Sequence, residues 1–230
     1  MPSFCRYILR TTDVEGASAF YRDLLGARFW EDRIEVVQLP PAVAARGAPA
    51  HWLGYIGVED VVGTALRFVQ SGATQLSALP QSGVASPEAI LRDPFGAIVA
   101  LTATTADADD RPVAWHLLGT RDEESAFALY QDLFGWTRGE AYDLGATRGR
   151  HITFGWNGST RVVGSASDVA RQPHVHPQWL FFFPTDDLER SLASVRAMDG
   201  LTLAPTTTAA GNPVAACDDP QGAAFGLYQV

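Results

Sequence analysis

The chain of 230 residues is 47% hydrophobic and 19% charged, a composition that allows a substantial core and excludes a disordered protein. Its formal net charge of -9 would repel phosphate backbones, which excludes nucleic acid as an expected partner. All 17 basic residues are arginine, so lysine Schiff bases, a pyridoxal phosphate anchor and a P-loop lysine are excluded as well.

No stretch approaches the roughly 18 apolar residues of a membrane helix, and the opening residues lack an apolar run behind a basic start. We therefore expect a cytoplasmic protein without a membrane partner. Cys5 and Cys217 are too few for a disulfide framework and lack metal-binding spacing, so both are expected to be buried free thiols.

In chain order, the first predicted elements are a short strand and a helix between Asp13 and Gly26. Asp is a favoured N-cap residue, and Gly is common where a helix ends. The same order of strand, acidic N-cap, helix and glycine returns around Asp60 and Gly72. The first helix would carry one apolar stripe for packing on a sheet, made of Val14, Ala17, Phe20, Tyr21, Leu24 and Leu25.

A tight turn is predicted at Asp93–Gly96, which reads Asp-Pro-Phe-Gly, and the chain nearly repeats it at Asp219–Gly222 as Asp-Pro-Gln-Gly. Asp suits the first position of a type I turn, Pro pre-sets φ at the second, and Gly closes the turn at the fourth. Each copy therefore predicts a hairpin between two strands.

These turns belong to a longer repeat. The stretch "FYRDLLG" from Phe20 returns as "LYQDLFG" from Leu129, an offset of 109 residues, and "HWLGYIGVEDV" from His51 returns as "QWLFFFPTDDL" from Gln178, an offset of 127. A constant order with one jump of 18 residues indicates a duplicated domain. We predict a first domain over 1–104, a polar and acidic linker over 105–112, and a second domain over 113–230.

The extra residues of the second domain fall between its first helix and its "QW" strand. Asn157-Gly158, between flanks rich in β-forming residues, is a strong hairpin signal there. The first domain has no counterpart, so we predict that it is shortened by one hairpin.

Together these motifs resemble the vicinal oxygen chelate superfamily, which includes glyoxalase I, bleomycin-resistance proteins and extradiol dioxygenases. The resemblance covers almost the whole chain and is greatest to tandem-domain, glyoxalase-like proteins of bacteria. It implies an α+β fold of two tandem domains, each of paired βαβββ units that form a cup-shaped mixed sheet with helices outside. It also implies a ligand cavity in each cup and, in catalytic members, a divalent metal that acts as a Lewis acid.

The resemblance places metal ligands, as His, Gln or Glu, on the first strand of a unit and beyond each Asp-Pro-x-Gly turn. Those six positions hold side chains that cannot bind a divalent ion: Arg6, Leu53, Ala100, Trp115, Leu180 and Gly226. No metal or other cofactor is therefore expected, and no catalytic residue is identified. The alternative is a metal held by residues from other places, such as His51, Glu35, His151 or the pair His174 and His176.

The side chains predicted to face the cups are mostly apolar or aromatic, with a few polar anchors. Such a cavity suits a planar or drug-sized molecule, and arginine can add a bidentate contact to a carboxylate or phosphate. His116 lies on the strand face opposite to Trp115 and Leu117, and we expect it to have a structural role. The predicted ligand-binding residues are Arg6, Arg10, His51, Trp115, Leu117, Phe154, Trp156, Gln178, Leu180 and Phe182.

Three functions stay open at this point. The favoured interpretation is a protein that binds a small apolar or aromatic metabolite or drug without a metal. The first alternative is a metal-dependent enzyme, namely a glyoxalase-like lyase, an isomerase or an extradiol-type dioxygenase. The second is a non-catalytic structural or partner-binding module whose cups have closed, an interpretation suggested by the shortened first domain. Assembly into a homodimer is left open.

Overall fold

The structure is a computed structural model that describes residues 1–26, 34–80, 87–103, 112–208 and 211–230. In the first half of the chain the elements are β1 (Ser3–Thr11), α1 (Val14–Leu25), β2 (Ile34–Gln38), α2 (Pro41–Ala44), β3 (His51–Val58), α3 (Val61–Gln70), β4 (Thr74–Gln75), β5 (Glu88–Arg92) and β6 (Ile98–Ala103). In the second half they are β7 (Trp115–Gly119), α4 (Glu123–Phe134), β8 (Thr137–Asp143), β9 (Arg150–Gly155), β10 (Gly164–Ser167), η2 (Asp168–Arg171), β11 (Gln178–Thr185), α5 (Leu188–Ala197), β12 (Leu201–Thr202), β13 (Thr206–Thr207), β14 (Pro213–Asp218) and β15 (Ala224–Gln229).

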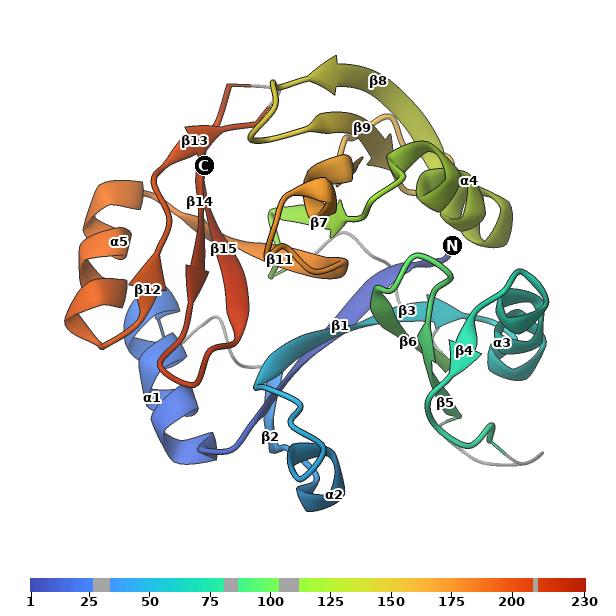
Figure 1. Ribbon diagram of the computed structural model, residues 1–230, viewed down its shortest axis with the longest axis horizontal. Helices are drawn as coiled ribbons and strands as arrows, with labels where there is room; N and C mark the ends of the chain where they lie inside the picture. The colour runs from blue at the N-terminus through green and yellow to red at the C-terminus, as the bar shows by residue number, and fades with distance from the viewer. Residues whose placement is uncertain (27–33, 81–86, 104–111, 209–210) are drawn as a thin grey trace. The chain divides into compact units, whose positions relative to one another are not determined.

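Two mixed sheets carry the fold of the described residues (Figure 1). The first sheet has six strands in the order β2-β1-β3-β6-β5-β4, and the second has nine, in the order β12-β14-β15-β11-β7-β10-β9-β8 with β13 paired to β14. Parallel pairs such as β3 with β6 and β11 with β15 occur beside antiparallel hairpins such as β5 with β6 and β14 with β15. The predicted α+β class with two mixed sheets is confirmed.

The chain divides into two compact units, which are described separately below. Unit 1 comprises Met1–Cys5, Gly54–Asp110 and His116–Trp179, and unit 2 comprises Arg6–Leu53, Arg111–Trp115 and Leu180–Val230. Each unit draws on both halves of the sequence, whereas each sheet uses strands of one half. The boundaries 1–104 and 113–230 remain predictions, and residues 105–111 of the predicted linker lie outside the described residues.

The helices begin where the sequence predicts them, because an aspartate accepts a hydrogen bond from the first turn of each. The carboxylate-to-amide distances are 2.9 Å for Asp13 in α1, 2.8 Å for Asp60 in α3, 3.0 Å for Asp122 in α4 and 3.0 Å for Asp187 in α5. Helix α4 ends at Gly135, whose φ of +69° is in the left-handed region that glycine adopts without strain.

Both Asp-Pro-x-Gly segments form the predicted turns. The Gly96 N–H donates to the Asp93 carbonyl at 3.1 Å, and the Gly222 N–H donates to the Asp219 carbonyl at 2.9 Å. The turns join β5 to β6 and β14 to β15. The predicted Asn157-Gly158 hairpin is also formed, because β9 and β10 pair antiparallel on either side of it.

The aspartate of the first turn is part of a buried hydrogen-bond relay in unit 1. Tyr130 of α4 donates its hydroxyl to Asp93 Oδ2 at 3.0 Å and accepts from the Trp179 indole N–H at 3.0 Å. Asp93 Oδ1 accepts the turn amides of Phe95 and Ala97, each at 2.9 Å. The relay therefore ties a turn, a helix and a strand together inside the protein.

Unit 2 contains the same relay, built from the matching repeat residues. Tyr21 of α1 donates to Asp219 Oδ2 at 3.1 Å and accepts from the Trp52 indole N–H at 3.0 Å. In unit 1 the tyrosine and tryptophan come from the second half of the sequence and the aspartate from the first half, and in unit 2 the assignment is reversed. The polar side chains of a motif in one half of the sequence thus find their hydrogen-bond partners in the other half.

Aromatic rings fill the core around these relays. In unit 1, Trp136 stacks on Phe154 at 5.1 Å and on Tyr130 at 5.4 Å. In unit 2, Phe183 lies 5.1 Å from Trp52, and Phe225 lies 5.3 Å from Tyr21. The strand faces that carry these rings are therefore filled by packed side chains.

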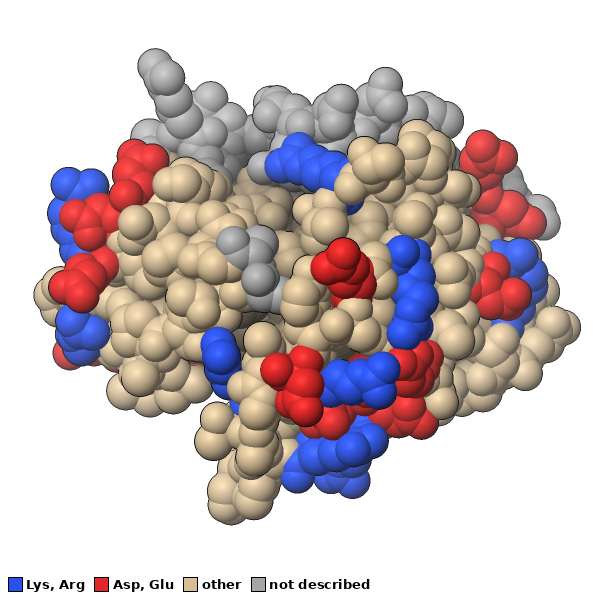
Figure 2. Space-filling view, turned by 90° about the horizontal axis from the view of Figure 1, so that it is seen from above, with Lys and Arg blue, Asp and Glu red and all other residues tan. Residues whose placement is uncertain are grey.

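Arginine and carboxylate side chains occur together on the surface (Figure 2). On the face shown in Figure 2, arginines and carboxylates are interspersed. Glu124 in unit 1 illustrates this arrangement, because it accepts from Arg138 at 2.8 Å and from Arg150 at 2.9 Å. Among the described helices, none is long and apolar enough to cross a bilayer.

We predict that Tyr130→Phe lowers the free energy of unfolding by about 1–3 kcal/mol, because it leaves a buried carboxylate oxygen and an indole N–H without their partner. Urea unfolding of the variant and the wild type measures this difference. Tyr142→Phe is the matched control, since its hydroxyl bonds Glu140 near the surface, and it should change stability by no more than about 0.5 kcal/mol. Equal effects of the two variants would contradict the assigned role of the relay.

We also predict a pH-dependent contribution from Asp93. Burial raises the pKa of this carboxyl above its ordinary value of 3.8, against the opposing effect of its hydrogen bonds. The folded state therefore holds the proton more tightly than the unfolded chain does, so the contribution to stability is complete below pH 3.8 and is lost as pH rises through the folded-state pKa. The stability of the wild type relative to Asp93→Asn should consequently increase from pH 7 to pH 4, and a constant difference would contradict this.

Candidate functional site

Strand β11 carries core residues on one face and candidate ligand contacts on the other. Trp179 packs in the aromatic core of unit 1, and Phe183 packs in that of unit 2. Because side chains alternate between the two faces of a strand, Gln178, Leu180 and Phe182 lie on the opposite face. Three of the predicted ligand-binding residues therefore avoid the helix-covered side of the strand.

In unit 2, five residues on three strands form what we call the aromatic face: Trp115, Leu180, Phe182, Gly226 and Tyr228. The Trp115 and Tyr228 rings lie nearly parallel at 17°, with 6.3 Å between their centroids. Phe182 pairs in register with Gly226, where its ring occupies the space that a Cβ atom would need. The face is largely covered, because Trp115 and Leu180 are 8% exposed and Phe182 is 5% exposed. Tyr228 stays partly exposed, and its partial burial raises its pKa.

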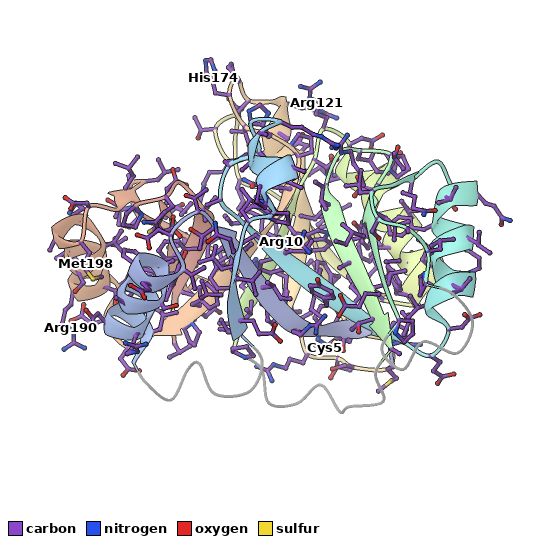
Figure 3. The ribbon with its side chains drawn as sticks, turned by 90° about the horizontal axis from the view of Figure 1, so that it is seen from below. Cys5, Arg10, Arg121, His174, Arg190 and Met198 are labelled. Atoms are coloured by element: carbon purple, nitrogen blue, oxygen red, sulfur yellow. The ribbon has the colours of Figure 1, made fainter. Side chains whose placement is uncertain are left out.

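The predicted polar contacts Arg6, Arg10 and His51 also belong to unit 2. Arg6 lies 4.0 Å from a Glu35 carboxylate oxygen, and Arg10 lies further along the same strand, as Figure 3 shows. His51 Nδ1 donates to the Pro49 carbonyl at 2.9 Å, so its lone pair is on Nε2. Burial lowers the His51 pKa and the Arg10 charge adds to this effect, while the bond to Pro49 opposes it. His51 is therefore a neutral hydrogen-bond acceptor at pH 7.

The remaining predicted residues lie in unit 1 and differ in their surroundings. Phe154 has no exposed surface and stacks on Phe127 of α4. Trp156 packs edge-on against His116 at 5.1 Å, and His116 bonds the Val163 carbonyl through Nδ1 at 2.9 Å. Phe154, Trp156 and His116 therefore belong to the core, whereas Leu117 is partly exposed on β7.

The pairing of His151 with Ser165 in unit 1 was not predicted from the sequence, which named His151 only as an alternative metal ligand. His151 Nδ1 lies 3.0 Å from Ser165 Oγ, and His151 Nε2 lies 3.0 Å from the Arg148 carbonyl oxygen. The pairing depends on the register of β9 with β10, and periodicity within one strand carries no information about it. Tyr228 was missed for the same reason, since only the pairing of β15 with β11 places it near Trp115.

The residues at the six implied metal positions do not fit a divalent cation. Five have no side-chain atom that can coordinate a cation, and Arg6 carries a positive charge that repels one. Elsewhere in the described residues, no group of three or more His, Cys, Asp or Glu side chains is arranged to hold a metal ion.

The alternative ligands named from the sequence have other surroundings. Glu35 faces Arg6 in unit 2, and both ring nitrogens of His151 lie within hydrogen-bond distance of protein atoms in unit 1. His174 and His176 are exposed in a loop, and Figure 3 shows His174 directed away from the strands. These residues therefore do not show a preformed ligand set.

Comparison with known proteins adds the family context. Residues 113–227 match the family model of the Glyoxalase/Bleomycin resistance protein/Dioxygenase superfamily, which is half of the chain. The proteins named "Putative glyoxylase CFP32" in Mycobacterium bovis and Mycobacterium tuberculosis are each 25% identical over 246 residues, covering 96% of this chain and 92% of the relative.

Solved structures share the fold over the whole chain. The 2,3-dioxygenase LapB from Pseudomonas sp. KL28 aligns with a TM-score of 0.62 at 14% identity, covering 100% of this chain and 91% of that one. The 2,2',3-trihydroxybiphenyl 1,2-dioxygenase from Sphingomonas wittichii strain RW1 aligns with a TM-score of 0.65 at 12% identity, covering 100% and 90%. At these identities the likeness concerns the fold alone.

We predict that any side chain introduced at Gly226 lowers stability, because an added Cβ would overlap the Phe182 ring. Gly226→Ala should therefore lower the free energy of unfolding by about 1–3 kcal/mol. The double variant Gly226→Ala/Phe182→Ala relieves the overlap, so Gly226→Ala should be less harmful in the Phe182→Ala background. A urea double-mutant cycle measures this coupling, and strictly additive effects would contradict the overlap.

Proposed function

We propose that this chain, which belongs to the Glyoxalase/Bleomycin resistance protein/Dioxygenase superfamily, binds a small apolar or aromatic molecule without a metal ion. The observation that carries the proposal is that glycine stands at position 226. A glutamate is expected there in a metal-binding relative, and here the space is filled by the ring of Phe182. This exchange replaces a charged metal ligand by apolar surface.

The aromatic face of unit 2 supports a planar apolar ligand. Trp115 and Tyr228 are nearly parallel, and aromatic side chains contact other rings in offset-stacked or edge-to-face geometry. Tyr228 is the partly exposed member and so offers the first contact to a ligand from solution. Leu180 and Phe182 supply apolar area, which dominates the lining of small-molecule sites.

Arg10 and His51 are the proposed polar contacts of unit 2 in the first sheet. His51 offers an acceptor at Nε2, and Arg10 offers a guanidinium that suits a carboxylate. Leu117 and Gln178 of unit 1 remain proposed contacts. A cytoplasmic location and a homodimer also remain proposals.

The name of the mycobacterial relatives motivates the second candidate, a metal-dependent lyase or dioxygenase. The donor chemistry at the six implied positions argues against it, because no carboxylate, imidazole or amide oxygen is present there. A non-catalytic module is the third candidate, favoured by the low exposure of Trp115, Leu180 and Phe182.

Metal binding is tested by elemental analysis of the purified protein after loading with Zn²⁺, Ni²⁺, Mn²⁺ or Fe²⁺ and dialysis. We expect far less than one ion per chain and no change of melting temperature with chelator. One retained ion per chain, lost from His51→Ala or His151→Ala, would overturn the proposal and support the enzyme.

Ligand binding is tested by thermal shift and tryptophan fluorescence with a panel of planar aromatic compounds. A hit should bind Tyr228→Leu about two- to tenfold more weakly, which corresponds to the loss of one aromatic contact of about 0.5–1.5 kcal/mol. Tyr142→Leu, on β8 and outside the aromatic face, should bind like the wild type. If no compound in the panel stabilises the protein, the non-catalytic module becomes the better interpretation.

A further inference from the structure

A serine, a histidine and a backbone carbonyl form a hydrogen-bonded chain in unit 1. The Arg148 carbonyl oxygen can only accept, so the His151 Nε2 that lies 3.0 Å from it carries the hydrogen. In the neutral imidazole, Nδ1 is then the acceptor, and Ser165 Oγ, at 3.0 Å, donates to it. The proton of the Ser165 hydroxyl therefore already points at a basic nitrogen.

The surroundings of His151 keep it in the basic form. Burial is the largest influence and lowers its pKa, and the positive charge of Arg148 acts in the same direction. The hydrogen bond to the Arg148 carbonyl and the charge of Asp168 act in the opposite direction. The net result is a pKa below the ordinary value of 6.5, so the imidazole is neutral at pH 7.

Strand pairing holds the two side chains in place. Strands β9 and β10 run antiparallel, with Ser165 opposite Thr153 and Ser167 opposite His151. Ser165 is also in register with Leu117 of β7. A serine fixed on a strand beside an oriented base has the arrangement of an activated nucleophile.

Ser167 shows that this arrangement is specific to Ser165. It lies two residues away on the same strand face and is also buried, but its Oγ accepts from the Val169 N–H at 3.3 Å and donates to the Arg148 carbonyl at 3.3 Å. Neither partner is a base that could remove its proton. Ser167 is therefore a matched control in the same strand.

We propose that Ser165 is a nucleophile toward small carboxylic esters, with His151 as its general base and the Arg148 carbonyl as the group that orients the imidazole. Only esters with a small acyl group are proposed as substrates, because Ser165 is only 1% exposed. This activity does not depend on the aromatic face of unit 2 or on the function proposed for it.

The reaction is balanced without a metal or a redox partner. Ser165 Oγ bonds to the ester carbonyl carbon, and its proton passes to His151 Nδ1. The bond from that carbon to the alcohol oxygen breaks, and the alcohol leaves with the electron pair and the proton from Nδ1. Water then attacks the acyl-serine and gives a proton to Nδ1, which returns it to Ser165 Oγ as the acid is released.

The test uses p-nitrophenyl acetate on the full chain, with release of nitrophenolate and the site of acetylation followed by mass spectrometry. The chain has no lysine, which removes a common source of non-specific acetylation. We expect one acetyl group per chain on Ser165 and none on that strand in Ser165→Ala. His151→Gln should slow acetylation by about 100-fold or more, since it can keep a hydrogen bond but is not a base.

Ser167→Ala should be acetylated like the wild type. A folded wild type that carries no acetyl group on Ser165, or an unchanged rate in His151→Gln, would overturn the proposal. Circular dichroism checks the fold of each variant, and His151→Gln alone decides the question if Ser165→Ala does not fold. Ligand affinity at the aromatic face is measured in the same variants, so failure of the acylation and failure of the binding function remain distinguishable.

Discussion

Two buried carboxylates, Asp93 and Asp219, constrain the whole structure. They are 3% and 2% exposed, and each depends on a tyrosine hydroxyl and on turn amides for its hydrogen bonds. An unpaired buried charge costs several kcal/mol, so turn, helix and tryptophan-bearing strand must take their places together. Because each relay combines residues from both halves of the chain, neither half can satisfy its own motif, which explains why the Asp-Pro-x-Gly turn occurs twice.

The same packing decides where function can reside. The strand faces that contact the relays are filled by aromatic rings and leave little room for a ligand, as Phe154 and Trp156 show in unit 1. The proposed functions therefore use the opposite faces. In unit 2 that face is apolar, with a phenylalanine ring where a metal ligand is expected, and in unit 1 it carries the paired His151 and Ser165. The superfamily's fold is thus retained, and the six positions at which the resemblance implies metal ligands hold no ligating side chain.

Local signals in the sequence predicted local structure well. The N-caps and both turns were recognised because the groups that bond there lie within four residues of one another. Leu180 and Phe182 fall on the strand face opposite to Trp179 and Phe183, because successive side chains of a strand point to opposite faces. Alternation along the strand does not place Trp156, because this residue lies beyond the end of β9. For Phe154, the position of α4 is needed to show which face of β9 the helix covers. Ser165 and Tyr228 depend on strand register.

The sequence by itself determined the order of elements, the duplication, the superfamily and the absence of ligating side chains at the expected metal positions, because each depends on residue type and spacing along the chain. Only the tertiary structure decided that the relays cross between the halves and that a serine meets a histidine in unit 1. Tyr21 and Asp219 are 198 residues apart, and Tyr130 and Asp93 are 37 apart. Contacts at such separations arise from burial and strand pairing in three dimensions, and no local pattern encodes them.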